Sequence, residues 1–396
     1  MQTTTMASVQ SEPEFAALVD ALAGDAAQRE QLTDLLREDH PIYDGRGTAT
    51  IVRMRGWVLL AFARAAVSDA ALIYVLEELD TGVDAYLVAA AARALRSYPR
   101  PTEALAPFVM RALANIRYRD EPVSFESYGE YAVAPTGTSP IRELLATLAW
   151  LGPHARGALA ELESFRTQSG GFSRKLRIDA ERAAQAIRGP VPGDEPGTHS
   201  CCGTTSDGVR SMSSWPSSLR RGTERIASVT LQDHKGALIT FKDFFQGQPS
   251  IVVFFYTRCD NPMKCSLTIA KLARVQKLLE AQGLADRIHT AAITYDPAFD
   301  LPERLRVYGQ DRGVRMDTGH RILRVTEDND VLRRHFELGV NFIESLVNRH
   351  RIEVYILDAK GRIATSFERI HWDEEQVVAR TVEMLKEEEC GSGIQA

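Results

Sequence analysis

Apolar residues recur every three or four positions along the first 190 residues of the chain. This spacing puts them on one face of a helix, so it predicts amphipathic α-helices rather than strands. Gly, Pro and Asp mark the short connections between these segments. The predicted helices cover residues 57–68, 70–79, 85–97, 103–116, 141–151, 154–165 and 173–187. The first half of the chain is therefore predicted to be all-α.

Two of these helices carry similar short sequences. Leu59–Ala65 and Ala89–Leu95 are weak copies of one another. Paired helices that are rich in small residues and repeat at such a period are typical of α-solenoids. Over residues 50–188 the pattern resembles HEAT repeats, and a compact helical bundle is the alternative. We predict a HEAT-like helical repeat domain, a solenoid, over residues 1–188.

Residues 189–224 differ in composition from what precedes them. Among the first 34 of these residues, 20 are Gly, Pro, Ser or Thr. Such a segment can bury little apolar surface, which predicts a flexible linker. It carries Cys201 and Cys202 just after His199. These residues are either a metal-capture or thiol-exchange element or ordinary linker residues, and the sequence leaves both readings open.

From residue 225 onward the pattern alternates between strands and helices. The continuous apolar run Ser250–Tyr256 predicts a strand that is buried on both faces. The order βαβ followed by ββα predicts a thioredoxin-like α/β domain over residues 225–390, with a tail at 391–396. The predicted strands cover 228–232, 238–241, 250–256, 288–295, 353–357 and 362–367, and the predicted helices cover 266–282, 301–309, 328–336 and 373–388.

Charge and composition exclude several classes of protein. A net charge of −6 gives no electrostatic reason to bind nucleic acid. No apolar run approaches the roughly 18 residues of a membrane span. The N-terminal sequence lacks the basic and apolar regions of a signal peptide, so we expect a cytoplasmic protein. Walker A, H-E-x-x-H, C-x-x-C-H and G-x-S-x-G motifs are missing from the sequence, so the chemistries that they support are not indicated.

The cysteines lie only in the second half of the chain. Two of the five, Cys259 and Cys265, lie where the buried strand 250–256 passes into the helix predicted at 266–282. Cys265 opens that helix, and a thiol at a helix N-terminus is expected to have a lowered pKa. Two cysteines at this spacing can form a disulfide or chelate one metal ion.

A histidine adds a third donor to this pair. His350 comes just before the predicted strand 353–357, in a stretch that runs beside the cysteine loop in thioredoxin-like folds. Two thiolates and one imidazole form a soft metal site that suits Cu(I) and can also hold Cu(II). The alternative is an exposed hairpin histidine between Arg349 and Arg351.

With these residues in place, the region 225–390 resembles the Sco/SenC family. The cysteines follow a strand that ends in Phe254-Phe255-Tyr256-Thr257, the second buried strand ends in Thr294-Tyr295-Asp296-Pro297, and His350 precedes the Asp358-Ala359-Lys360-Gly361 hairpin by eight residues. The family binds copper and serves assembly of the binuclear copper site of cytochrome oxidase. The resemblance implies that Cys259, Cys265 and His350 are copper ligands.

The cysteine loop departs from the family pattern. The family spaces its cysteines C-x-x-x-C, each followed by Pro, and is usually membrane-anchored outside the cytosol. Here the spacing is C-x5-C, and Asp260 and Ser266 follow the two cysteines. Two extra residues change the bite of a chelate and the strain of any disulfide.

We therefore predict a copper-binding Sco-like protein that serves copper delivery or copper-dependent redox chemistry. Its helical domain would dock a protein or peptide partner, because solenoids expose long concave surfaces. A copper site recruited for oxidation of a delivered substrate is a further possibility. The alternative is a metal-independent thiol–disulfide oxidoreductase or peroxidase, in which Cys265 is the nucleophile and Cys259 resolves the intermediate.

The remaining candidates are expected to be structural. Asp296 is predicted to form a turn that caps the following segment. His371 and Trp372 are predicted to pack beside the hairpin, and the Arg-rich stretch 304–315 to form a solvated helix face. We expect no role for Cys390 near the tail.

Overall fold

The computed structural model describes residues 9, 11–126, 128, 137–167, 173–190, 225–259, 261–343, 346–368 and 372–392. The chain divides into two compact units, Met1–Val209 and Arg210–Ala396, each with its own core. The predicted linker, with His199, Cys201 and Cys202, lies outside the described residues. Among those that are described, no helix is long and apolar enough to cross a membrane.

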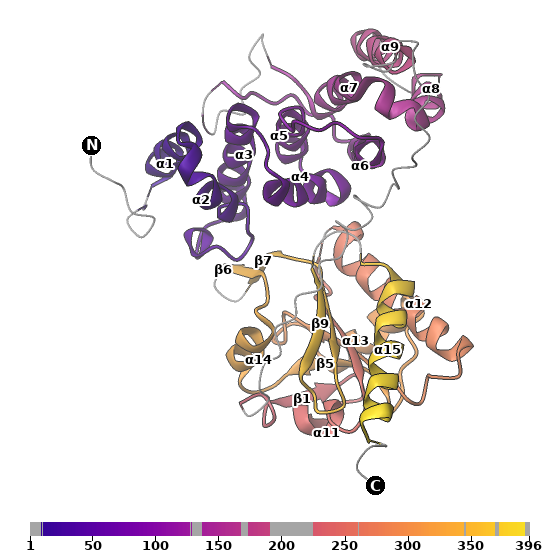
Figure 1. The fold of residues 1–396 in the computed structure, drawn as a ribbon. Coiled ribbons are helices and arrows are strands. Elements are labelled where there is room, and N and C mark those ends of the chain that lie inside the picture. The colour runs from indigo at the N-terminus through magenta and orange to yellow at the C-terminus, as the bar shows by residue number, and fades with distance from the viewer. Residues whose placement is uncertain are drawn as a thin grey trace. The chain divides into compact units, whose positions relative to one another are not determined.

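The first unit is helical, as predicted (Figure 1). Two of its helices were not predicted, α1 and α2. A capping box begins α1, since the Ser11 side chain accepts from the Glu14 amide and the Glu14 carboxylate accepts from the Ser11 amide. The helices are α1 (Glu12–Gly24), α2 (Arg29–Asp34), α3 (Thr48–Ala65), α4 (Asp69–Thr81), α5 (Ala85–Leu95), α6 (Ala106–Ile116), α7 (Pro140–Leu151), α8 (Leu159–Thr167) and α9 (Arg174–Arg188).

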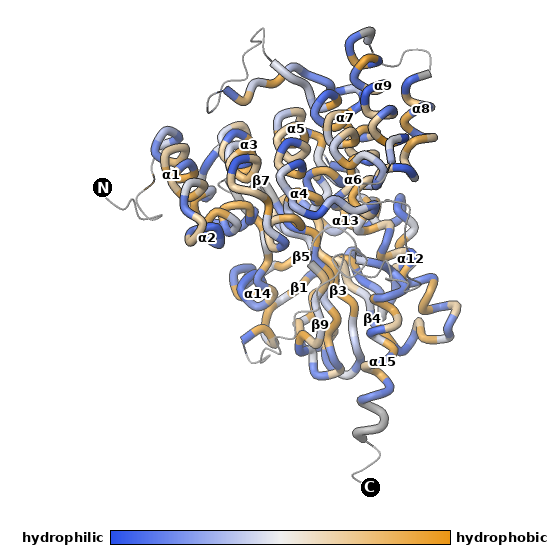
Figure 2. The backbone as a smooth tube through the Cα atoms, turned by 45° about the horizontal axis from the view of Figure 1, so that its top comes forward, coloured by the Kyte–Doolittle hydropathy of each residue, from blue (hydrophilic) through white to orange (hydrophobic). Residues whose placement is uncertain are grey.

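Successive odd-numbered helices of this unit pack against one another. Contacts run from α1 to α3, α5, α7 and α9 in turn, while α4 packs on α5 and α6. Along these helices hydrophobic and hydrophilic positions alternate, as their amphipathic pattern requires (Figure 2). The helical prediction is confirmed, whereas the assignment to HEAT repeats is not and stays a prediction.

The second unit is a seven-stranded mixed sheet flanked by helices, the predicted thioredoxin-like arrangement (Figure 1). The strand order is β2-β1-β5-β4-β3-β8-β9, and β6 pairs with β7 in a separate hairpin. The strands are β1 (Thr230–Asp233), β2 (Leu238–Thr240), β3 (Ser250–Phe255), β4 (His289–Thr294), β5 (His320–Val325), β6 (Val340–Ile343), β7 (Leu346–His350), β8 (Glu353–Leu357) and β9 (Ile363–Glu368). The helices are α11 (Phe241–Phe245), α12 (Leu267–Ala281), α13 (Pro302–Asp311), α14 (Asn329–Phe336) and α15 (Glu374–Ser392).

The strand directions bring three loops to one edge of the sheet. Strand β3 runs parallel to β4 and antiparallel to β8. The carboxyl ends of β3 and β4 therefore lie beside the start of β8. Because Val253 pairs with Val354, the residues just before Glu353 lie next to those that follow Phe255. This edge is where the predicted cysteine loop and His350 should meet.

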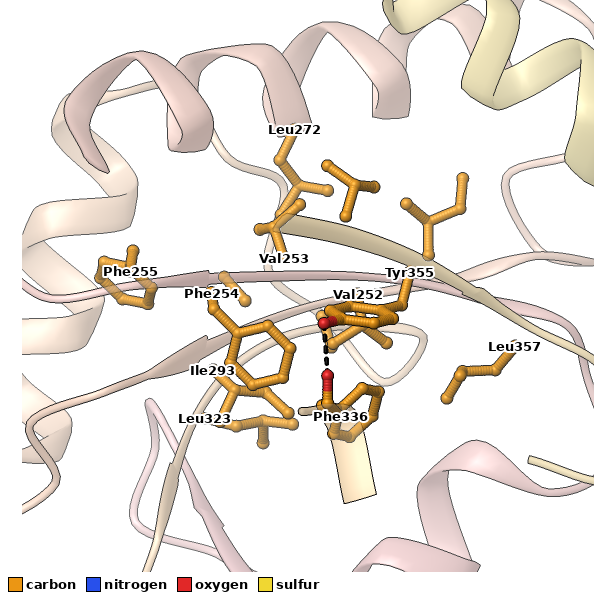
Figure 3. Packing of buried hydrophobic residues seen from close by; sticks show 14 of the residues in the cluster. Val252, Val253, Phe254, Phe255, Leu272, Ile293, Leu323, Phe336, Tyr355 and Leu357 are labelled. Atoms are coloured by element: carbon orange, nitrogen blue, oxygen red, sulfur yellow. Dashed lines mark hydrogen bonds between the residues drawn. The ribbon is translucent and has the colours of Figure 1, made fainter. Parts of the chain in front are cut away.

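Alternating residues of β3 pack on opposite faces of the sheet. Figure 3 shows Val253 beside Leu272 of α12, whereas Phe254 lies with Ile293 and Phe336 on the other face. The ring centroids of Phe254 and Phe336 are 5.0 Å apart. All six residues of β3 are buried, as the continuous apolar run predicted.

Three parts of this unit were not predicted: strand β5, the β6–β7 hairpin and the short helix α11, whose first residue was predicted to end a strand. Strand β5 inserts between β4 and β1, and its apolar residues Ile322, Leu323 and Val325 are buried. The β6–β7 hairpin places His350 at the end of a strand rather than in a loop. Neither β5 nor the β6–β7 hairpin has the long apolar run that marked β3, because Arg321 and Arg324 interrupt the sequence of β5 and Asn348 and Arg349 interrupt that of β7.

Candidate metal centre

Three sequence segments supply the side chains of the site. Cys259 follows the carboxyl end of β3, and Cys265 lies in a π-helical turn, Pro262–Ser266, that leads directly into α12. His350 is the last residue of β7, three residues before β8 begins. The parallel pairing of the sheet and the antiparallel return of β8 therefore put all three at the same edge.

The structure brings these three predicted residues together. The Sγ atoms of Cys259 and Cys265 and one ring nitrogen of His350 all lie within 4.8 Å of one another. His350 Nε2 is 3.6 Å from Cys259 Sγ and 3.3 Å from Cys265 Sγ. It is the only group of three or more such donors within the described part of the chain.

The longer cysteine spacing does not separate the sulfurs. The π-helical turn accommodates extra chain between Cys259 and α12 while keeping Cys265 at the start of the helix. Single π-turns of this kind are frequent at functional sites because they insert a residue without breaking the helix. Among the described cysteines both of this pair are free thiols.

The site is closed on most sides. Cys265 is 1% exposed and His350 is 4% exposed, whereas Cys259 is partly exposed. The alternative of an exposed hairpin histidine is therefore wrong, because His350 is buried where β7 leads into β8. Anything that approaches the site from solvent approaches Cys259.

One backbone contact selects the histidine nitrogen that faces the sulfurs. His350 Nδ1 is 2.8 Å from the carbonyl oxygen of Arg351. A carbonyl oxygen can only accept, so Nδ1 carries the hydrogen and Nε2 points its lone pair or proton at the cysteines. Proteins usually orient a metal-binding imidazole by such a hydrogen bond from the ring nitrogen that faces away from the metal.

Two tyrosines hold the imidazole ring in place. Tyr256 lies edge-on to His350, and Tyr295 is tilted against it, each with a centroid separation of 5.3 Å. Both tyrosines directly follow strands, β3 and β4, which are rigidly paired. The ring of His350 is thereby fixed from two sides.

Behind Tyr295 lies a buried carboxylate. Glu353 is completely buried, and its Oε2 accepts from the Tyr295 hydroxyl at 2.9 Å. Its Oε1 accepts from the Gly339 amide at 2.8 Å and forms an ion pair with Arg351 at 3.1 Å. Burial, followed by the charge of Glu353, raises the pKa of Tyr295 well above its usual value, so this phenol stays protonated. Glu353 is therefore the hub that connects Tyr295, Arg351 and, through them, His350.

A second buried carboxylate fixes the strand end that precedes Cys259. Asp300 is fully buried and accepts hydrogen bonds from the Thr257 amide, the Thr257 hydroxyl and the Thr294 hydroxyl. Burial raises the pKa of Asp300. Asp296 forms turns with the residues after it, as predicted, and also pairs with Arg258 beside the cysteine loop.

The pKa values of the two thiols are shifted in opposite directions. The pKa of Cys259 is lowered to about 3, chiefly because the Cys265 thiol donates a hydrogen bond to it and because His350 stabilises its thiolate. Burial raises the pKa of Cys265 well above its usual value, and the neighbouring Cys259 thiolate adds to this. The expectation of a lowered pKa at the helix start is wrong for Cys265, because desolvation outweighs the helix terminus. Cys259 is the thiolate of the pair.

This assignment predicts an unusual pH dependence of cysteine alkylation in the metal-free, reduced chain. Because the pKa of Cys259 is about 3, it is already deprotonated at about pH 5, and its alkylation by iodoacetamide should keep a nearly constant rate up to about pH 8. An ordinary thiol gains roughly tenfold in thiolate per pH unit over this range. Mass spectrometry of the Cys259 and Cys265 peptides measures both rates. A tenfold rise per unit at Cys259, or faster labelling of Cys265, would contradict the assignment.

Among the described residues, none of the other predicted candidates belongs to this group of donors. Trp372 packs in the core of the sheet unit, and its carbonyl accepts from Lys271 Nζ at 2.6 Å. His371 and the side chain of Cys390 lie outside the described residues. Within the Arg-rich stretch 304–315, Arg312 is half-buried and bonds to Ser266, so this helix face is only partly solvated.

Several residues of the site were not predicted. Tyr256, Tyr295, Glu353 and Asp300 have no recognisable motif chemistry of their own. The available signal was position, since Tyr256 and Tyr295 directly follow the two buried strands, and Glu353 is a charged residue that begins an otherwise apolar strand. Residues at the carboxyl ends of neighbouring parallel strands are expected to face a common site.

Comparison with known proteins finds a family model that matches part of the second unit. The family model for SCO1/SenC matches residues 219–386. No curated protein matches the chain.

Several solved structures are similar to this part of the chain. Copper-bound yeast Sco1 is 25% identical, with 40% of this chain and 90% of that chain covered and a TM-score of 0.31. A SCO1/SenC family lipoprotein from Bacillus anthracis is 20% identical, with 39% and 92% covered and a TM-score of 0.35. Arabidopsis thaliana ScoI with copper bound is 17% identical, with 44% and 99% covered and a TM-score of 0.33. Residues 219–386 thus match the SCO1/SenC family model, in the same part of the chain that carries the ordered strands, cysteines and histidine.

Proposed function

We propose that this protein binds one copper ion through Cys259 Sγ, Cys265 Sγ and His350 Nε2. The observation that carries the proposal is the convergence of these three donors within 4.8 Å, from segments as far apart as residues 259 and 350. Yeast Sco1 and Arabidopsis ScoI have copper-bound structures, which supports copper over other metals.

The chemistry of the donors suits this ion. Thiolates are soft ligands that favour Cu(I), and imidazole suits both oxidation states of copper. Copper bound here would be cargo for delivery or a one-electron redox centre. The chain itself supplies a thiolate at Cys259, a shielded second sulfur at Cys265 and a histidine whose Nε2 is held toward both.

The delivery role requires a partner. We infer that the partner is a protein or peptide and that the helical unit binds it, because helical arrays present extended surfaces. The partly exposed Cys259 is the ligand through which copper would be passed on. The buried Cys265 and His350 would release the ion last.

An anaerobic titration of the reduced full chain tests the proposal. We expect one Cu(I) per chain that resists removal by a chelator, and retention of Cu(I) in the presence of excess Zn²⁺. The variant His289→Gln, at the opposite end of β4, provides a matched histidine control and should bind like the unmodified chain. Failure to retain copper, or its displacement by zinc, would contradict the proposal.

A second candidate function follows from the free thiols. Cys259 is a partly exposed thiolate with Cys265 beside it, which is the arrangement of a redox dithiol. The roles of the two cysteines are then the reverse of those suggested by the sequence, since Cys259 and not Cys265 is the thiolate. The Cys259 thiolate would attack a substrate disulfide and release one substrate thiolate. Cys265 would then displace the second, leaving a Cys259–Cys265 disulfide. This function predicts that His350→Ala preserves most of the activity, whereas copper binding should not survive that substitution unchanged.

A further inference from the structure

The accessible side of the site is bordered by arginines. Arg258 directly precedes Cys259, and its guanidinium carbon lies 4.0 Å from the centre of the Phe299 ring. Arg304, at the start of α13, lies 3.6 Å from the centre of the same ring. Two guanidinium groups therefore converge on one aromatic side chain, and one of them belongs to the residue that precedes Cys259, the partly exposed ligand.

A third arginine extends this border past Cys265. Arg312 stacks on Tyr308, 3.5 Å from the ring centre, and donates from Nε to the Ser266 hydroxyl at 3.1 Å. We call Arg258, Arg304 and Arg312 the arginine rim. Stacking on aromatic rings holds a guanidinium in place, so less rotamer freedom is lost when it binds a ligand.

Most of the positive charge of the rim has no carboxylate partner. Asp296 pairs with Arg258. Arg304 donates to the Phe299 carbonyl, and Arg312 to Ser266 and to the Tyr308 carbonyl. Within the described residues no carboxylate forms an ion pair with either of these two arginines. Nearby arginines of the same unit are paired, Arg315 with Asp317 and Arg321 with Asp233.

We propose that the arginine rim binds carboxylate groups of a protein that exchanges copper or thiols with Cys259. Guanidinium groups bind carboxylates bidentately, and a cluster of one sign raises the rate at which an oppositely charged partner arrives. This inference deepens the proposed function and rests on Cys259 being its point of exchange.

The extent of the rim favours a protein over a small anion. Arg304 and Arg312 lie at opposite ends of α13, and eight residues of helix rise about 12 Å. One carboxylate or phosphate cannot span that distance, whereas an acidic surface can.

Two disulfide reagents that differ in charge test the rim without copper. In the reduced chain, 5,5′-dithiobis(2-nitrobenzoate) carries two carboxylates, and 4,4′-dithiodipyridine is neutral. In each reaction the Cys259 thiolate attacks the disulfide and forms a mixed disulfide, and one aromatic thiolate leaves. Cys201, Cys202 and Cys390 are replaced by serine in all samples, so that only the pair at the site reacts.

The measured quantity is the rate with 5,5′-dithiobis(2-nitrobenzoate) divided by the rate with 4,4′-dithiodipyridine. A change in the nucleophilicity of Cys259 affects both rates and cancels in this ratio. We expect Arg304→Gln and Arg312→Gln each to lower the ratio at least roughly threefold at low salt, and added salt to lower it in the unmodified chain. Arg306→Gln removes the same charge from the same helix, but Arg306 donates to Gln310 and stacks on neither ring. This control should leave the ratio unchanged. An unaltered ratio in both rim variants, or an equal fall with Arg306→Gln, would overturn the proposal.

A second experiment, on the copper-loaded chain, separates this inference from the proposed function. Removal of Cu(I) by the anionic bathocuproine disulfonate is compared with removal by the uncharged neocuproine. If copper is held but charge selectivity is missing from both experiments, the rim proposal fails and the copper proposal stands. If copper is not held, the copper proposal fails, and the disulfide reagents alone decide the role of the rim.

Discussion

Replacing Cys265 by serine is expected to weaken Cu(I) binding at least roughly 100-fold. Substitution of a residue that merely orients a metal ligand typically lowers the metal affinity 10–100-fold. Removal of a ligand itself should lower the affinity at least as much. Serine has nearly the size of cysteine, but its hydroxyl does not ionise at neutral pH and is a poor ligand for Cu(I). Competition with a Cu(I) chelator of known affinity measures the change.

The control for this substitution is Cys390→Ser, which removes a sulfur from α15 rather than from the site. It should bind Cu(I) as tightly as the unmodified chain. Circular dichroism of both variants establishes that they remain folded. Binding by Cys265→Ser within about threefold of the unmodified chain would show that the buried thiol is not a ligand, even though its sulfur lies 3.3 Å from His350 Nε2.

Replacing Glu353 by alanine is expected to destabilise the sheet unit by roughly 3–5 kcal/mol. Removing one member of a buried ion pair leaves the other charge uncompensated, which is the most costly way to break such a pair. Here the Arg351 guanidinium would lose its carboxylate, and the Tyr295 hydroxyl and the Gly339 amide would lose the acceptor that Glu353 provides. Glu353→Gln keeps an acceptor for Tyr295 and should cost less.

Hydrogen exchange of peptides from β3 and β8 measures this loss in the full chain, because it reports on the sheet unit separately from the helical unit. Glu383→Ala on α15 is the matched control, since Glu383 pairs with Arg380 at the surface. Surface substitutions of this kind usually change stability by no more than about 0.5 kcal/mol. A loss below about 1 kcal/mol for Glu353→Ala would contradict the role of Glu353 as the hub.

The elements around the cysteines were predictable because their signals are local. The apolar run of β3, the helical spacing of α12 and the alternating hairpin of β8 and β9 are each visible in a short window. The resemblance of the ordered motifs then placed Cys259, Cys265 and His350 in one site. The structure brings the same three residues together.

The parts that were missed depend on contacts between distant segments. Strand β5 is recognisable only once β4 and β1 are beside it, and the pairing of β7 with β6 buries His350. Tyr295 and Glu353 are 58 residues apart, and their hydrogen bond follows from the parallel pairing of β4 with β3 and the return of β8. The pattern of residues along the chain does not predict which residues of distant strands pair with one another.

The opposite pKa shifts of the two cysteines also depend on contacts that the sequence pattern does not show. Position at a helix start argued for a lowered pKa at Cys265, but the effect of a helix terminus is modest beside full burial. Only the folded environment shows that Cys265 is enclosed and that Cys259 receives the hydrogen bonds.

X-ray absorption at the copper edge of the Cu(I)-loaded full chain tests the central claim most directly. The account predicts two sulfur ligands and one nitrogen ligand. The nitrogen signal should be lost in His350→Ala and kept in His289→Gln, because His350, and not His289, presents Nε2 to both sulfurs. A copper environment without two sulfurs, or one whose nitrogen ligand persists in His350→Ala, would contradict it.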